Sequence, residues 1–151
     1  MTTSETPLPS IAPNVKEKFE AMLQLNRPTM GDALGLRFIT VSKEEMRASM
    51  PVNEQTIQPF GILHGGASVA LAETLASIGA YLNLDHPDHI AVGLEINANH
   101  IKSVRKGGTV VGISRPIHRG AQTQVWETRI ETKSGKLVSI SRCTLAVVSR
   151  K

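Results

Sequence analysis

The chain has 151 residues, of which 40% are hydrophobic and 20% charged, and its formal net charge is +4. This length fits one domain with one core, and this balance excludes both a disordered chain and a membrane-spanning one. Because the chain has only one Trp, one Tyr and three Phe, we expect a core of mainly aliphatic side chains.

The first residues of the chain, MTTSETPLPS, have neither a basic start nor an apolar stretch, so we expect no signal peptide. The single cysteine, Cys143, excludes an internal disulfide and favours a reducing compartment. These features predict a cytoplasmic protein in which residues 1–13 form a loose tail and residues 14–151 form a single domain.

A short helix and two strands are the first predicted elements. Residues 15–25 place their apolar side chains on one helical face. Residues 36–41 and 46–52 are typical of strands, and the second alternates apolar and polar positions. After a break over residues 53–60, the pattern predicts one long helix over residues 65–84.

Four more segments are typical of strands, and glycine-containing turns separate them. They are residues 90–101, 109–117, 123–132 and 136–148. Since hairpin-length turns join antiparallel neighbours, these four segments predict a meander. The chain as a whole predicts an α+β fold, in which one long helix packs on a mainly antiparallel sheet of about six strands.

The two faces of the predicted long helix differ in composition. The expected core face consists of Ala67, Leu71, Thr74, Leu75, Ile78 and Leu82, and the opposite face consists of Gly66, Val69, Glu73, Ala76, Ser77 and Ala80. An exposed face would carry several charges, but Glu73 is the only charged residue in this helix. We therefore expect the second face to be buried against the same helix of a second subunit. By itself, Glu73 is equally compatible with a structural acid that pairs with a base.

The start of this helix has residues suited to binding a carbonyl oxygen. The first N–H groups of a helix are free to donate, and the helix dipole favours negative charge there. Gly65 N–H is the main expected donor, and Gln58 and His64 lie just before it. Ser77 follows Glu73 by one turn and could hold a water. Taken singly, each of these polar residues also has a structural explanation, such as a loop amide or a hydroxyl bonded to the backbone.

Distance separates the two halves of this candidate site. His64 and Glu73 are nine positions apart, which is roughly 13 Å along a helix at ~1.5 Å per residue. They cannot share one substrate within one subunit. Two antiparallel helices around a twofold axis would bring Glu73 of one subunit to Gly65 of the other, which predicts two composite sites per dimer.

The runs QPFGILHGGASVALAETLAS at 58–77 and VGLEINANHIKSVRKG at 92–107 resemble those of a known enzyme family. They are similar to the hotdog-fold thioesterases of the phenylacetate-pathway and 4-hydroxybenzoyl-CoA (Arthrobacter-type) group. Within it, the similarity is to bacterial thioesterases that hydrolyse 1,4-dihydroxy-2-naphthoyl-CoA or proofread the enterobactin carrier protein. The resemblance implies a hotdog-fold acyl-CoA thioesterase acting on aryl or medium-chain acyl groups, with acyl-carrier protein thioesters as further substrates. It also implies a homotetramer built as a dimer of dimers.

The same resemblance implies a role for each candidate residue. Glu73 would be the nucleophile or the general base, and Gly65 N–H would polarise the thioester carbonyl. Gln58 and His64 would orient the thioester and assist the departing thiolate, and Ser77 would position water. The expected CoA-binding residues are Asn99, His100, Lys102, His118, Arg119 and Gly120.

We expect no cofactor beyond the CoA of the substrate and no metal, because the other histidines lack the spacing of zinc ligands. The basic residues after position 100 could meet phosphates or form a solvated surface. A nucleic-acid partner is not expected, since stacking aromatics and a recognition motif are missing. An acyl-CoA hydratase or dehydratase, or a non-catalytic acyl-CoA-binding protein of the same fold, is the alternative.

Overall fold

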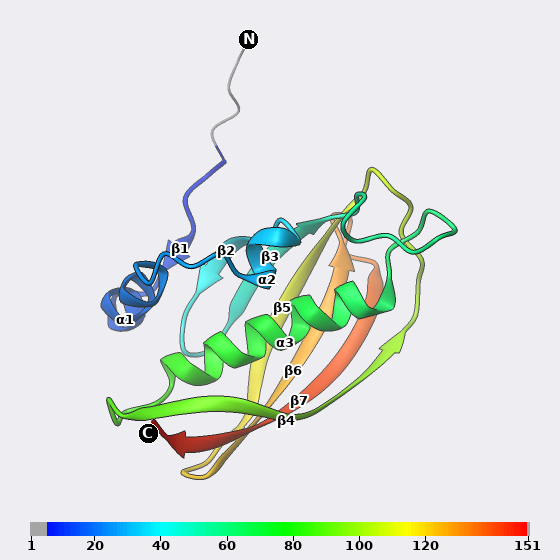
Figure 1. Ribbon diagram of the computed structural model, residues 1–151. Coiled ribbons are helices and arrows are strands. Elements are labelled where there is room, and N and C mark those ends of the chain that lie inside the picture. The colour runs from blue at the N-terminus through cyan, green and yellow to red at the C-terminus, as the bar shows by residue number, and fades with distance from the viewer. Residues whose placement is uncertain (1–5, 151) are drawn as a thin grey trace.

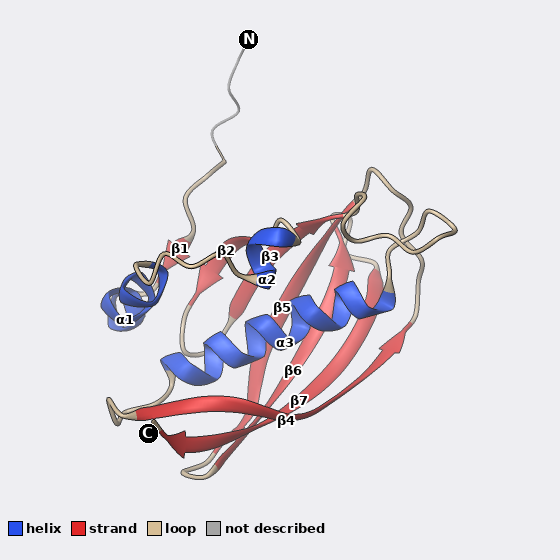
Figure 2. Cartoon of the chain, in the orientation of Figure 1, coloured by secondary structure: helices blue, strands red, loops and turns tan. Residues whose placement is uncertain are grey.

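The computed structural model describes residues 6–150, which form one sheet crossed by one long helix (Figure 1 and Figure 2). The elements in chain order are β1 (Ser10–Ile11), α1 (Pro13–Leu23), α2 (Met30–Ala33), β2 (Arg37–Val41), β3 (Met46–Pro51), α3 (Gly65–Leu82), β4 (His89–His100), β5 (Thr109–Arg119), β6 (Thr123–Thr132) and β7 (Leu137–Ser149). The predicted α+β architecture is confirmed, with seven strands instead of about six.

The strands have the order β1-β2-β3-β5-β6-β7-β4, and every pair is antiparallel except β1 with β2. The predicted four-stranded meander is wrong, because β4 pairs with β7 at the far edge and β5 pairs with β3. The connection over residues 101–108 does not close a hairpin. It is bound instead to the segment before α3, where Leu63 N–H donates to Val104 at 2.8 Å and Lys106 N–H donates to Gly61 at 3.0 Å.

Close packing on the sheet determines how α3 is rotated about its axis. A Cβ at Gly79 would lie 2.6 Å from the ring of Trp126, so the helix approaches the sheet closely at that glycine. The buried Gln124 amide donates to the Ala80 carbonyl at 3.2 Å and accepts from the Trp126 indole at 2.9 Å. This buried network satisfies its own polar groups and holds α3 in one orientation.

The observed rotation corrects the predicted helix faces. The buried residues of α3 are Ala67, Ser68, Leu71, Ala72, Leu75, Ala76, Gly79, Ala80 and Leu82. Ala76 and Ala80 were expected on the outer face but lie in the core, whereas Thr74 and Ile78 are only half-buried. The difference arises because Gly79, Ala80 and Ala76 are small enough to sit directly on the sheet. Glu73 and Ser77 remain on the outer face, as expected.

The N-terminal boundary also differs from the expectation. Ser10 and Ile11 pair with Thr40 and Val41 as a short parallel strand, and α1 begins at Pro13. Ordered structure therefore begins before residue 14, and residues 1–5 of the expected tail lie outside the described residues. Neither β1 nor α2 was predicted. Within residues 6–150, no helix combines the length and the apolar character needed to cross a bilayer.

Candidate active site

His64 shapes the start of α3 by capping the helix. Its backbone is extended, its Nδ1 accepts a hydrogen bond from Gly66 N–H at 2.8 Å, and its own N–H donates to the Thr56 carbonyl at 2.8 Å. Gly65 N–H has no acceptor among residues 6–150, as expected for the first residue of a helix. This amide is therefore free to donate to a bound carbonyl oxygen, with the helix dipole behind it.

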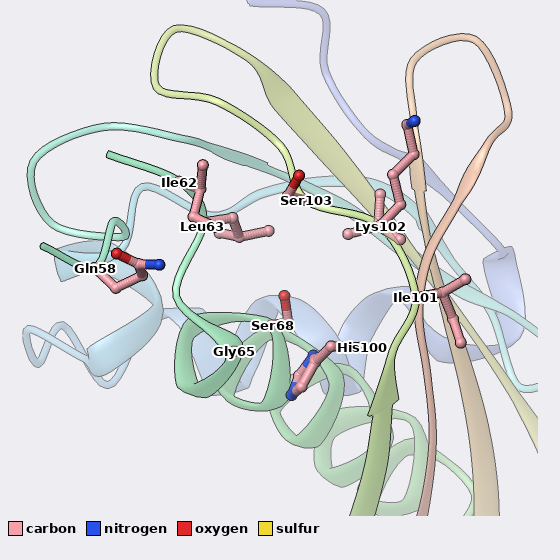
Figure 3. Close-up of a pocket in the computed structure, with 10 residues that line it drawn as sticks. Gln58, Ile62, Leu63, Gly65, Ser68, His100, Ile101, Lys102 and Ser103 are labelled. Atoms are coloured by element: carbon pink, nitrogen blue, oxygen red, sulfur yellow. The ribbon is translucent and has the colours of Figure 1, made fainter. Parts of the chain in front are cut away.

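A cavity of about 270 Å³ opens beside this amide, between the N-terminus of α3 and the end of β4 (Figure 3). Its lining residues are Gln58, Ile62, Leu63, Gly65, Ser68, His100, Ile101, Lys102, Ser103 and Val138. The Gln58 side-chain oxygen accepts from Phe60 N–H, so its amide nitrogen is free to donate. Figure 3 shows that nitrogen directed toward the cavity. The cavity thus combines aliphatic walls with several hydrogen-bond donors.

Glu73 lies in a separate open groove of about 550 Å³ on the outer face of α3. The groove is lined by Met30, Gly66, Val69, Ala70, Glu73, Thr74, Ser77 and Ile78. The half-buried Glu73 carboxylate has no hydrogen bond or ion pair with any residue from 6 to 150. One of its oxygens lies 2.7 Å from where a Cβ at Gly93 would be, so β4 has a glycine where Glu73 crosses it. Among residues 6–150, Glu73 therefore has no basic partner of the kind that a structural acid would need.

One protomer does not bring the whole predicted catalytic set together. The cavity contains Gln58 and Gly65, the groove contains Glu73 and Ser77, and the two share no residue. The eight positions from Gly65 to Glu73 correspond to roughly 12 Å along the helix axis. His64 lines neither the cavity nor the groove.

The predicted CoA-binding residues also fall into two groups. Asn99, His100 and Lys102 lie at the end of β4, beside the N-terminus of α3, whereas His118, Arg119 and Gly120 lie at the end of β5. Arg119 donates to the Glu44 carboxylate at 2.8 Å and to Asn83 Oδ1 at 3.1 Å, and Asn83 caps the C-terminus of α3. The 18 residues of α3, roughly 27 Å long, therefore separate the two groups within one protomer.

Met30, Ser68 and Ser103 are among the lining residues of these two sites that were not predicted from the sequence. Met30 belongs to the unpredicted α2, and Ser103 belongs to the connection after β4. Ser68 had a usable signal, because it is a polar residue three positions after Gly65 on the same face as Leu71. A hydroxyl within an apolar helix face, one turn after a glycine at the helix start, indicates a ligand site.

The reactivity of Cys143, on β7, reports whether the packing around Glu73 and Glu95 is intact. Burial, together with the negative charges of Glu73 and Glu95, raises the pKa of the Cys143 thiol to about 11. At pH 8 only roughly 0.1% of it would be thiolate, which is the reactive form. We expect the native protein to react with DTNB at least about 100-fold more slowly than the protein unfolded in guanidinium chloride. Equal rates in the two states would contradict the buried position of this thiol.

Comparison with known proteins finds relatives that are named as thioesterases or thioester hydrolases. The family model described as "Thioesterase superfamily" matches residues 60–139. The chain is 42% identical over 133 residues to 1,4-dihydroxy-2-naphthoyl-CoA hydrolase from Escherichia coli, covering 88% of this chain and 96% of the relative. It is 46% identical over 120 residues to the enzyme of the same name from Listeria monocytogenes, covering 80% and 96%. The crystal structure of thioesterase HI1161 from Haemophilus influenzae matches with a TM-score of 0.79 and 42% identity, covering 86% of this chain and 90% of that one.

Proposed function

This chain belongs to the thioesterase superfamily and has its hotdog fold, and we propose that the acyl-CoA thioesters it hydrolyses carry aryl groups. The observation that supports hydrolysis of a thioester is the Gly65 N–H, which has no acceptor within residues 6–150 and lies at the start of an 18-residue helix, beside a cavity with further donors. The two similar hydrolases named for a naphthoyl thioester support an aryl group. Medium-chain acyl-CoA is the second substrate class, favoured by the aliphatic residues of the Glu73 groove.

In the proposed reaction, the thioester carbonyl oxygen accepts a hydrogen bond from Gly65 N–H, and the Gln58 amide provides a second polar contact. Such donors are worth about 2.7–4 kcal/mol each when they meet the charge that develops on the oxygen. Glu73 supplies the carboxylate, either as general base toward water or as nucleophile toward the carbonyl carbon. Ser77, one turn further along α3, positions the water.

We propose that each complete site is formed by two subunits. β4 is a 12-residue edge strand, and the exposed apolar side chains of Val92 and Leu94 lie on it. Long unprotected edges of this kind usually pair or are covered. A twofold axis that pairs this edge and sets two α3 helices antiparallel would bring Glu73 to Gly65 of the other subunit. Resemblance to the family extends this proposal to a dimer of dimers in the cytoplasm.

Release of free thiol from a panel of CoA esters tests the proposed function. We expect hydrolysis of benzoyl-, 4-hydroxybenzoyl- and 1,4-dihydroxy-2-naphthoyl-CoA, with kcat/KM at least about tenfold above that for hexanoyl-CoA. Acyl-carrier protein thioesters have the same phosphopantetheine arm, so the matching benzoyl-carrier thioester belongs in the panel. Binding of these esters without thiol release would instead show a non-catalytic acyl-CoA-binding protein.

Lys102, at the rim of the cavity, is the expected contact for CoA phosphates. Lys102→Ala should raise KM for benzoyl-CoA about tenfold, because a phosphate loses its cation, and should change benzoyl-N-acetylcysteamine hydrolysis less than twofold. Lys16→Ala, which removes the same charge from α1, is the matched control. Equal effects of Lys102→Ala on both esters would place this lysine away from the nucleotide.

A further inference from the structure

The imidazole beside the candidate oxyanion donor belongs to His100, not to His64. The ring of His64 is engaged in capping, because its Nδ1 accepts from Gly66 N–H, and the residue does not line the cavity. By contrast, Nε2 of His100 lies 2.7 Å from the position that a Cβ at Gly65 would take. The His100 ring therefore occupies space that only glycine leaves open. Neither of its ring nitrogens has a hydrogen-bond partner in the part of the chain from residue 6 to 150.

Ser68 provides a second unpaired group in the same cavity. The residue as a whole is only 2% exposed, and its hydroxyl has no hydrogen-bond partner within the described residues. Thr74 shows the alternative for a helix hydroxyl, because it donates to the Ala70 carbonyl at 2.7 Å. Figure 3 shows the Ser68 oxygen directed into the cavity, with His100 beside it. Since no fully buried side-chain oxygen or nitrogen within residues 6–150 lacks a partner, the Ser68 oxygen is accessible from the cavity and free to meet a ligand atom there.

Charge indicates which part of the substrate lies in this cavity. A thioester carbonyl bound at Gly65 has the rest of the acyl group on one side of its carbon and the sulfur on the other. Lys102 lies on the rim of the cavity, and Figure 3 shows its ammonium group directed away from α3. Of the described residues that line the groove, Glu73 alone is titratable, and it is acidic. CoA carries its phosphates at the end of the thiol arm. The cationic side therefore favours the sulfur and its arm in the cavity of one subunit, and the acyl group in the Glu73 groove of the other.

We propose that His100 and Ser68 donate hydrogen bonds to the thioester sulfur as the carbon–sulfur bond breaks, an inference that rests on the proposed hydrolysis. The oxygen of water forms the new bond to the carbonyl carbon, and that water loses one proton to the Glu73 carboxylate. The carbon–sulfur bond then breaks, and its electron pair leaves with sulfur. The proton taken from water ends on the thiol, while the His100 and Ser68 protons stay on their own atoms. Both residues thus stabilise negative charge that exists only late in the reaction.

Dependence on the leaving group tests this role. Two benzoyl thioesters share the acyl group, one with N-acetylcysteamine, a weakly acidic thiol, and one with 4-nitrothiophenol, a strongly acidic thiol that needs little help to leave. We expect His100→Phe and Ser68→Ala to lower kcat/KM for the first ester about 10- to 100-fold and for the second less than about threefold. His100→Gln, which keeps an N–H donor, should recover at least half of the logarithmic loss.

The remaining outcomes separate this role from others. His86→Phe, which replaces an exposed histidine in the loop after α3, is the matched control and should leave both esters unaffected. Equal losses on the two esters, or no rescue by His100→Gln, would overturn the proposal and show a packing role against Gly65. Hydrolysis of benzoyl-CoA by the wild-type protein checks the proposed function separately. Its absence would refute both proposals, whereas its presence with equal losses would refute only this one.

Discussion

Glu73→Gln should lower kcat for benzoyl-CoA by at least about 10³-fold, which corresponds to about 4 kcal/mol of activation free energy. The reason is chemical, since an amide of nearly the same shape can neither accept the proton of water nor attack a carbonyl carbon. We expect the stability of the fold to be unaffected by this change. The Glu73 carboxylate is half-buried and has no hydrogen bond or ion pair with any residue from 6 to 150 that its loss would break.

Stopped-flow or steady-state thiol release gives kcat, and calorimetric titration with a non-hydrolysable benzoyl-CoA thioether gives Kd. The Kd and the thermal unfolding midpoint of Glu73→Gln should stay close to those of the wild type. Glu127→Gln is the matched control, because Glu127 lies on β6 between Trp126 and Thr128, which face α3, and so projects from the opposite face of the sheet. A kcat for Glu73→Gln within tenfold of the wild-type value would remove Glu73 from the reaction.

Mixing two inactive variants should restore activity if the site is shared between subunits. Glu73→Ala removes the carboxylate, and Gly65→Val places a branched side chain where the His100 ring lies, which closes the cavity at the amide. In a mixed dimer, one site carries both defects and the other site carries neither. Random exchange makes half of the dimers mixed, so activity should rise from near zero to about a quarter of the wild-type value.

Native mass spectrometry of differently tagged subunits shows whether exchange has occurred, and circular dichroism shows whether Gly65→Val is folded. Wild-type protein mixed with Glu73→Ala is the control and should show activity in proportion to the intact sites. Complete exchange without recovered activity would mean that Glu73 and Gly65 of one chain serve the same site. The antiparallel arrangement of α3 helices would then be wrong, and α3 would have to unwind between residues 65 and 73.

Features that depend on local periodicity were predictable from the sequence alone. The 18 residues of α3 repeat apolar positions at helical spacing, and the start at Gly65 was predicted correctly. Glu73 could be singled out because it is the only charge in this helix, and the oxyanion donor could be inferred because the first amides of any helix lack intrahelical acceptors. The alternating strands β3, β5, β6 and β7 were predicted for the same reason, since the period of a strand is visible within a few residues.

Features that depend on contacts between distant segments were decided only by the tertiary structure. The rotation of α3 follows from Gly79 packing on Trp126, 47 positions later, so no helical periodicity could place Ala76 and Ala80 in the core. The position of β4 beside β7 is given by their long antiparallel ladder, which runs from His89 paired with Ser149 to His100 paired with Ser139. His100 reaches Gly65 for the same reason, because the end of β4 is brought there by the sheet. Helix capping and periodicity act over a few residues, whereas the site is assembled by packing between elements whose separation along the chain carries no local signal.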